Sequence, residues 1–233
     1  MTDTIRIFIG YDAREVVAYH VLSHSILVRA SQPVSLHPLI LSQLSDVFTR
    51  ERNPLQSTDF AFTRFLTPYL AGYQGWAIFM DSDMLVLEDI AKLYALRDEK
   101  YAVQVVKHDY TPKTDTKFLG QVQTKYEKKN WSSVMLMNCA KCKALTPEYV
   151  NKASGLELHR FHWLDSESLI GELPLEWNFL VDEYEERPVS QVANLHYTQG
   201  GPYYPEYAEC GYAKEWLDEQ DRMSYAAPIK GGV

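Results

Sequence analysis

Residues 76–87 read WAIFMDSDMLVL, and the rest of the chain is organised around this stretch. Apolar runs flank Asp81-Ser82-Asp83, and an unpaired carboxylate buried in such surroundings costs several kcal/mol or more. Alternate side chains of an extended segment share one face, so Asp81 and Asp83 are expected to point to the same side. That spacing suits one divalent cation carrying a diphosphate. The alternative is a solvated acidic turn at a strand end, which a D-x-D by itself would favour; the flanking apolar runs together with the rest of the chain favour the metal site.

The composition is typical of an ordinary globular protein with one domain. The 233 residues suffice for a sizeable core, and they contain no internal repeat. The 23 basic and 31 acidic residues give a net charge of −8, which argues against broad nucleic-acid binding because such binding needs a basic face. We therefore predict a single domain over residues 1–233, with a tail at 203–233.

Targeting signals and cysteines favour a cytoplasmic location. The N-terminus MTDTIRIFIG has no basic leader, and no apolar stretch approaches the roughly 18 residues of a membrane-spanning helix. Cys139, Cys142 and Cys210 do not form a disulfide framework, and a single C-x-x-C without a second pair does not indicate zinc. We predict a cytoplasmic protein with reduced thiols.

The first forty residues predict an α/β fold. An apolar strand at Ile5–Gly10, a helix from Arg14 to Arg29 and a second strand at Val34–Leu41 form a crossover unit. Asp12 lies in the loop after the first strand, where such sheets bind nucleotides. It could accept a hydrogen bond from a base or ribose, or cap the helix. The loop lacks G-x-G-x-x-G, which argues against a dinucleotide-dependent redox enzyme.

Further along the chain, a helix is expected from Ser57 to Tyr73, kinked at Pro68. Arg64 within it is either a structural ion-pair partner or a phosphate ligand. Leu173–Phe179 is expected to be extended, and Val192–Leu195 is expected to be the last strand. Residues 166–170 and 213–223 favour helical structure, the latter because it is amphipathic.

Residues 108–130 form a long segment without clean periodicity. Long loops in compact domains are usually functional or mobile. We interpret this segment as a mobile loop, either a lid over a phosphate-bearing donor or acceptor, or a solvated excursion. Its lysines are interleaved with Tyr110, Phe118 and Tyr126; they are Lys113, Lys117, Lys125, Lys128 and Lys129.

Other candidate site residues lie in the second half of the chain. His196 follows a strand and precedes a glycine-rich turn, so it is the best histidine ligand, although a lone histidine is usually structural. Gly200 and Gly201 would let backbone amides approach an anion closely. Asp165 and Glu167 could bond acceptor hydroxyls or stabilise a developing oxocarbenium charge, or they could be helix-start carboxylates.

Taken together, these motifs resemble the GT-A glycosyltransferases, and most closely glycosyltransferase family 8. The family's aromatic-x-Arg-Leu helix is similar to Phe62-Thr63-Arg64-Phe65, its D-x-D is similar to Asp81-Ser82-Asp83, and its Leu-Pro…Trp-Asn stretch is similar to residues 173–178. Its D-Q-D segment is matched only loosely by residues 165–167. Its late motif H-x-x-G-x-x-K reads His196, Gln199 and Pro202 here, so the lysine is missing.

The resemblance implies one GT-A domain with a Rossmann-like nucleotide-binding half and a mixed, mostly parallel sheet flanked by helices. It further implies a retaining, Mn²⁺-dependent (or Mg²⁺-dependent) enzyme that uses a UDP-sugar. The metal would be held by Asp81, Asp83 and His196, and the catalytic residues would be Arg64, Asp165 and Glu167. The donor would also contact a set of mostly small or polar residues, namely Gly10, Tyr11, Asp12, Arg64, Ser82, Gly200 and Gly201.

The leading hypothesis is therefore transfer of a hexose from a nucleotide diphosphate sugar. A nucleotidyltransferase ranks below it, because the loop after the first strand lacks a Gly- and Lys-rich triphosphate site. A non-catalytic sugar-binding module is the third reading, for which Tyr203, Tyr204 and Tyr207 supply aromatic density. The acceptor stays open among glycan, lipid-linked glycan, protein and nucleic-acid base, and the sequence indicates no oligomeric state.

Overall fold

The computed structural model describes residues 4–52, 56–109, 116–117, 121–122 and 127–225. Most of the segment predicted as a mobile loop, and the end of the predicted tail, lie outside the described residues. Within that segment β6 (Thr116–Lys117) pairs antiparallel with β7 (Gln121–Val122). None of the helices in the described ranges is both long enough and apolar enough to cross a bilayer.

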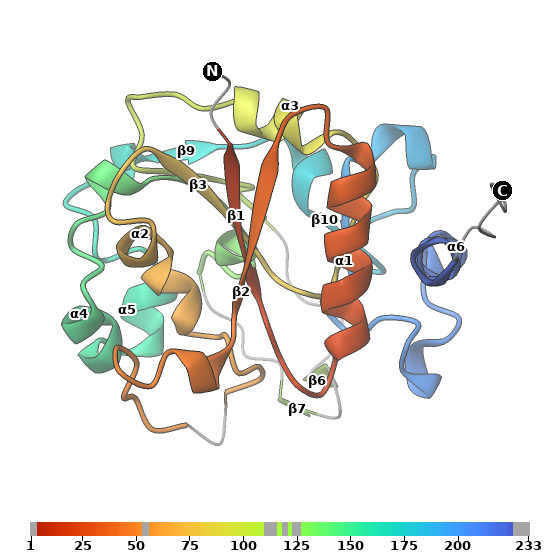
Figure 1. Ribbon diagram of the computed structural model, residues 1–233, viewed down its shortest axis with the longest axis horizontal. Helices are drawn as coiled ribbons and strands as arrows, with labels where there is room; N and C mark the ends of the chain where they lie inside the picture. Colours follow the sequence, from red (N-terminus) through yellow and green to blue (C-terminus); the bar gives the residue numbers. More distant parts are fainter. Residues whose placement is uncertain (1–3, 53–55, 110–115, 118–120, 123–126, 226–233) are drawn as a thin grey trace, which may run out of the picture.

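A six-stranded mixed sheet forms the centre of the molecule (Figure 1). Its order is β2-β1-β3-β8-β5-β9, in which β1–β2, β1–β3 and β5–β9 are parallel and β8 runs antiparallel to both its neighbours. This confirms the predicted α/β domain with a mixed sheet flanked by helices. The bounds are β1 Ile5–Gly10, β2 Val34–Leu39, β3 Trp76–Met80, β5 Val103–Val105, β8 Val134–Asn138 and β9 Ile170–Glu172.

Side-chain alternation along the strands builds a core on each face of the sheet. Ile7 and Ile78 face α1 (Val16–Arg29) and α3 (Ile90–Ala95). Phe8 and Phe79 face the opposite core, which also contains residues of the three short helices on the left of Figure 1 or of the turns beside them. These helices are α2 (Thr67–Leu70), α4 (Pro147–Lys152) and α5 (Gly155–His159).

A second, smaller sheet has the strand order β10-β11-β4. The chain passes from the central sheet into it through residues 81–83, which connect β3 to β4. Its strands are β4 (Met84–Val86), β10 (Phe179–Leu180) and β11 (Asn194–His196). β11 runs antiparallel to β4 with His196 opposite Met84. The last strand therefore brings its histidine next to the acidic stretch that ends β3.

Helix α6 (Ala213–Ser224) lies beside α1 (Figure 1), and a buried carboxyl group of α6 joins the two helices. Glu219 pairs with Arg29 through both oxygens and with His24 Nδ1 at 2.7 Å. Burial alone raises the pKa of Glu219, but the hydrogen bonds and charges of Arg29 and His24 outweigh it, so the pKa lies below its usual range. The ion pair thus fixes the amphipathic C-terminal helix.

We expect Glu219→Gln to lower the free energy of unfolding by about 2 kcal/mol at pH 7, because Arg29 keeps some access to water and the penalty is below that of a fully buried pair. The pKa of Glu219 is depressed in the fold, so its contribution is complete above the unfolded value of about 4.3 and is lost as the pH falls below it. Urea unfolding of the wild type and of Glu219→Gln from pH 7 to pH 3 should show that the difference between their free energies of unfolding shrinks. A difference that grows in acid would contradict this expectation.

Two stretches differ from the sequence predictions. The expected helix 57–73 is a 3₁₀ turn at Thr63–Leu66 followed by α2. Pro68 lies in the first turn of α2, where its missing N–H costs nothing, so the helix restarts there instead of kinking. Leu173–Phe179, expected to be extended, contains a 3₁₀ turn at Leu175–Asn178 that begins after Pro174.

Boundaries elsewhere shift by a few residues. Ile170, expected at the end of a helical piece, begins β9, and only Glu167–Leu169 forms a 3₁₀ turn. The last strand starts at Asn194 and includes His196. The remaining 3₁₀ turns are Leu41–Gln43, Trp131–Ser133, Cys139–Lys141, Val189–Gln191 and Pro205–Tyr207.

Candidate active site

Three metal-ligand side chains converge where the two sheets meet. Asp81 directly follows β3, Asp83 directly precedes β4, and His196 ends β11. The backbone N–H of Tyr197 donates to the Asp83 carbonyl at 2.9 Å, which ties β11 to the acidic turn. One ligand atom from each residue lies within 4.8 Å of the others. The structure thus brings together the three residues that the sequence proposed as metal ligands.

Hydrogen bonding orients the imidazole ring toward the acids. His196 is 2% exposed, and its Nδ1 lies 2.9 Å from Oδ1 of the fully buried Asn178. A ring that donates from Nδ1 to this carbonyl oxygen leaves Nε2 as a lone-pair donor. Nε2 lies 3.4 Å from Asp83 Oδ1, a buried oxygen that accepts no hydrogen bond from the described residues. Two electron-pair donors facing each other fit a shared cation.

The donor set has a preference among metals. Two carboxylates supply hard oxygen ligands, and an imidazole suits transition metals better than Mg²⁺ or Ca²⁺. The side chains of Asp81 and Asp83 are 13% and 20% exposed, so the acids remain open to solvent on one side. The residues present therefore fit a divalent cation with open coordination positions.

Arg64 is a partner of the acidic turn. Its Nη1 lies 2.8 Å from Asp81 Oδ1 and 3.0 Å from the carbonyl of Ser132, and its side chain is 7% exposed. The guanidinium also lies near the rings of Phe60 and Phe79. The ion-pair interpretation of the sequence is thus observed, and a role as phosphate ligand stays a prediction.

Asp12 is occupied by donors of its own chain. Oδ1 accepts from the N–H and Nε of Arg14 at 2.9 Å, and Oδ2 accepts from Arg14 Nη2 at 2.5 Å and the N–H of Asp59 at 3.0 Å. A carboxylate has about four acceptor positions, so all are filled. Asp12 holds the loop after β1 in place, and a direct nucleoside contact would have to displace one of these donors.

The predicted donor-binding glycines have neighbouring rings over them. A Cβ atom would overlap Phe60 at Gly10, Tyr207 at Gly200 and Tyr203 at Gly201. These positions therefore require glycine for close ring packing. The turn after His196 places aromatic rings against the backbone at Gly200 and Gly201. Tyr11, also predicted to hold the nucleoside, is half-buried and packs edge-on against Tyr19.

Asp165 and Glu167 lie on the surface before β9. Both are exposed, and Glu167 pairs with Lys128. Ser166 caps the short 3₁₀ turn through a bond from the N–H of Ser168. Their assignment to the donor sugar or acceptor stays a prediction.

Sequence reasoning assigned no role to two residues at this site. Asn178 orients His196. The sequence pointed to this asparagine only as part of the Trp-Asn pair in the stretch 173–178. Glu15 is 3% exposed and accepts from Ser82 Oγ at 2.9 Å and Tyr203 Oη at 3.2 Å. Burial raises the pKa of Glu15 well above its usual range, and the nearby Asp83 raises it further. In the sequence, the only indication of a role for Glu15 is its position just before α1.

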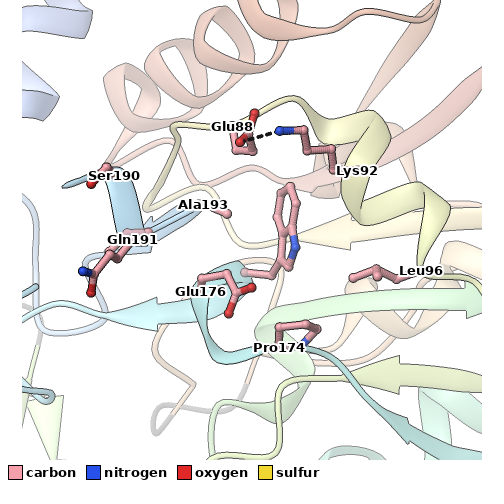
Figure 2. Close-up of a pocket in the computed structure, with 10 residues that line it drawn as sticks. Glu88, Lys92, Leu96, Pro174, Glu176, Ser190, Gln191 and Ala193 are labelled. Atoms are coloured by element: carbon pink, nitrogen blue, oxygen red, sulfur yellow. Dashed lines mark hydrogen bonds and ion pairs between the residues drawn. The ribbon is translucent and has the colours of Figure 1, made fainter. Parts of the chain in front are cut away.

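A separate depression of about 330 Å³ lies at the other end of β4 and β11 (Figure 2). Glu88 and Lys92 form an ion pair on its wall, and Pro174, Glu176 and Gln191 also line it. None of the predicted site residues lines this depression, so it is distinct from the metal-ligand cluster.

Comparisons with known proteins place this geometry in context. No protein-family model matches the chain. Protein CDI of Arabidopsis thaliana is 50% identical over 226 residues, which cover 94% of this chain and 87% of that protein. The similarity therefore extends over nearly the whole length of both proteins.

Solved structures of glycosyltransferases share the fold. The glycosyltransferase GlyE of Streptococcus pneumoniae TIGR4 has a TM-score of 0.62 and 12% identity, covering 99% of this chain and 67% of that one. The galactosyltransferase LgtC, in complex with donor and acceptor sugar analogues, has a TM-score of 0.58 and 11% identity, covering 96% and 98%. The bifunctional glycosyltransferase WbbM has a TM-score of 0.58 and 15% identity over 94% of this chain, which spans 50% of that protein. The chain has a GT-A fold.

Proposed function

Because this chain belongs to the family of the Arabidopsis thaliana Protein CDI and has the fold of GT-A glycosyltransferases, we propose that it is a metal-dependent glycosyltransferase. It moves a hexose from a nucleotide diphosphate sugar to an acceptor. The observation that carries this proposal is the cluster of Asp81, Asp83 and His196 where β3, β4 and β11 meet.

Each residue of the cluster has a chemical task in this proposal. A divalent metal, when bound, neutralises the charge that develops on the departing diphosphate without proton transfer. Asp81, Asp83 and His196 Nε2 would hold it. Asn178 keeps the proton on Nδ1 and leaves Nε2 available for the metal. Arg64 adds a fixed positive charge beside Asp81.

The finer assignments rest on the donor chemistry and on the family resemblance. We propose Mn²⁺ as the metal, because the set includes an imidazole. We propose a UDP-sugar as donor and retention of anomeric configuration because family 8 implies both. Because the lysine expected after His196 is missing, we propose that Arg64, which lies 2.8 Å from Asp81 Oδ1, contacts the diphosphate. The acceptor is a glycan, a lipid-linked glycan, a protein or a nucleic-acid base.

We expect Mn²⁺ to raise the melting temperature of the protein, and Mn²⁺ with the right nucleotide sugar to raise it further. A ligand present at 100 times its dissociation constant stabilises the fold by about 2.7 kcal/mol. For a chain of this size that corresponds to a rise of roughly 5–10 °C. The measurement is a thermal-shift screen of UDP-, GDP- and CDP-sugars with Mn²⁺ or with EDTA.

Hydrolysis of the donor that gives the largest shift then tests for catalysis. Release of free sugar and nucleoside diphosphate only in the presence of Mn²⁺ supports an enzyme. The proposal fails if no donor shifts the melting temperature and none is hydrolysed with Mn²⁺. A donor that binds but is never cleaved, with or without added acceptors, favours a sugar-binding module.

A further inference from the structure

A buried polar chain connects the acidic turn to the C-terminal part of the protein. Ser82 is fully buried, and its Oγ donates to Glu15 Oε1 at 2.9 Å. The other oxygen, Oε2, accepts from Tyr203 Oη at 3.2 Å. Glu15 is the residue that precedes α1, so three distant segments meet at one carboxyl group.

Ser82 is the central residue of the acidic turn. The turn is held by the backbone at both ends, since the N–H of Asp81 donates to the Ser133 carbonyl and the Asp83 carbonyl accepts from Tyr197. Its middle is fixed by the side-chain bond from Ser82 to Glu15. The chain bends at Ser82 and Asp83 between β3 and β4, so the bond from Ser82 fixes the centre of the bend whose two flanking residues carry the carboxylates.

The far end of this chain is anchored by aromatic packing. The ring of Tyr203 lies 5.0 Å from the ring of the fully buried Trp216 in α6, and Gly201 leaves room for it. Glu15 is therefore supported from the side away from the turn. The contacts run without a gap from α6 through Tyr203 and Glu15 to Ser82.

We infer that Glu15 is a positioning residue for the metal site and acts through Ser82. It is not one of the three clustered ligand residues, and its two oxygens accept from the hydroxyl groups of Ser82 and Tyr203. Its task is to fix the turn so that the two aspartates present their carboxylates to one cation. This inference rests on the proposed metal site. Hydrogen-bond partners of metal ligands typically change metal affinity by 10–100-fold, and we expect Glu15, which is one contact further from the ligands, to act at the lower end of that range.

Calorimetric titration of the full chain with Mn²⁺ alone tests the inference. Ser82→Ala and Glu15→Ala should each weaken Mn²⁺ binding by about tenfold or more. Glu15→Gln should recover most of the affinity, because its amide can pair with both hydroxyls. The double variant should bind no more weakly than the weaker single variant, since residues that act through one contact are not additive.

Glu99→Ala is the matched control. Glu99 also accepts two side-chain hydrogen bonds, from Trp76 Nε1 and Asn138 Nδ2, at the opposite end of β3. Its loss should leave Mn²⁺ affinity within about twofold of the wild type, because it lies outside the chain of contacts that reaches Ser82. Melting temperature and near-UV circular dichroism show that each variant is folded, and Ser82→Ala and Glu15→Gln are conservative enough to stay so.

Three results would count against the inference, and they differ. Wild-type protein that does not bind Mn²⁺ overturns the proposed function and this role with it. Wild-type protein that binds while Ser82→Ala and Glu15→Ala bind equally well overturns the positioning role alone. If the losses of Mn²⁺ affinity in Ser82→Ala and Glu15→Ala multiply in the double variant, Glu15 acts on the metal independently of Ser82. That result also overturns the positioning role.

Discussion

Asp83→Asn is expected to abolish metal-dependent sugar transfer while leaving the chain folded. The amide keeps the size of the side chain but removes the charge that would bind the cation. Losing about 4 kcal/mol of charge stabilisation corresponds to a roughly thousandfold fall in kcat. In the metal-free protein the melting temperature should stay nearly constant, because Asp83 is partly exposed and the substitution keeps the size of its side chain.

Donor hydrolysis and thermal unfolding of the same preparation separate these effects. Asp218→Asn is the control, because this exposed aspartate on α6 pairs only with Lys214 among the described ion pairs. It should retain wild-type activity and the Mn²⁺-dependent thermal shift. Normal transfer by Asp83→Asn in the presence of Mn²⁺ would show that the metal assignment is wrong.

Arg64→Met is expected to have the largest effect on stability in this region. It removes an ion-pair partner of the largely buried Asp81 carboxylate and the donor to the Ser132 carbonyl. Breaking a buried pair from one side costs about 3 kcal/mol, because the remaining charge is uncompensated. The melting temperature should fall by roughly 6–12 °C for a chain of this length.

Added Mn²⁺ distinguishes this explanation from a simple packing defect. A cation at Asp81 would compensate the charge that Arg64 no longer balances, so Mn²⁺ should stabilise Arg64→Met more than the wild type. Arg52→Met is the control, since the exposed pair Arg52–Asp59 should contribute about 1 kcal/mol or less. Equal Mn²⁺ shifts in Arg64→Met and the wild type would contradict the assignment of the metal to Asp81.

The fold is largely predictable from the sequence because its central strands are apolar runs with clear ends. Ile5–Gly10 and residues 76–80 are such runs, and β1 and β3 match them. The short elements are not predictable in the same way. The sequence predicts a helix and an extended segment where 3₁₀ turns lie next to Pro68 and Pro174, since local proline rules fix a boundary but not the conformation of the residues beyond it.

The candidate site is predictable where one residue type carries the chemistry. The two aspartates stand out because they interrupt an apolar run, and His196 stands out because it lies between a strand and a glycine-rich turn. Their supporting partners do not stand out. Asn178 and Glu15 matter through contacts with His196 and Ser82 that the fold creates, and a sequence shows no such distances. Asp12 is the opposite case, because the sequence offers it as a nucleoside ligand, whereas in the folded chain its acceptor positions are filled by neighbouring residues.

The pairing of β4 with β11 determines when the site can exist during folding. The two aspartates belong to the first half of the chain, and His196 arrives only after the last strand has docked. Contacts between segments so far apart form slowly, because the chain entropy of a long loop must be lost first. A partly synthesised or partly folded chain would thus carry both acids yet lack the complete ligand set. Tight metal capture would therefore follow the docking of β11 onto β4.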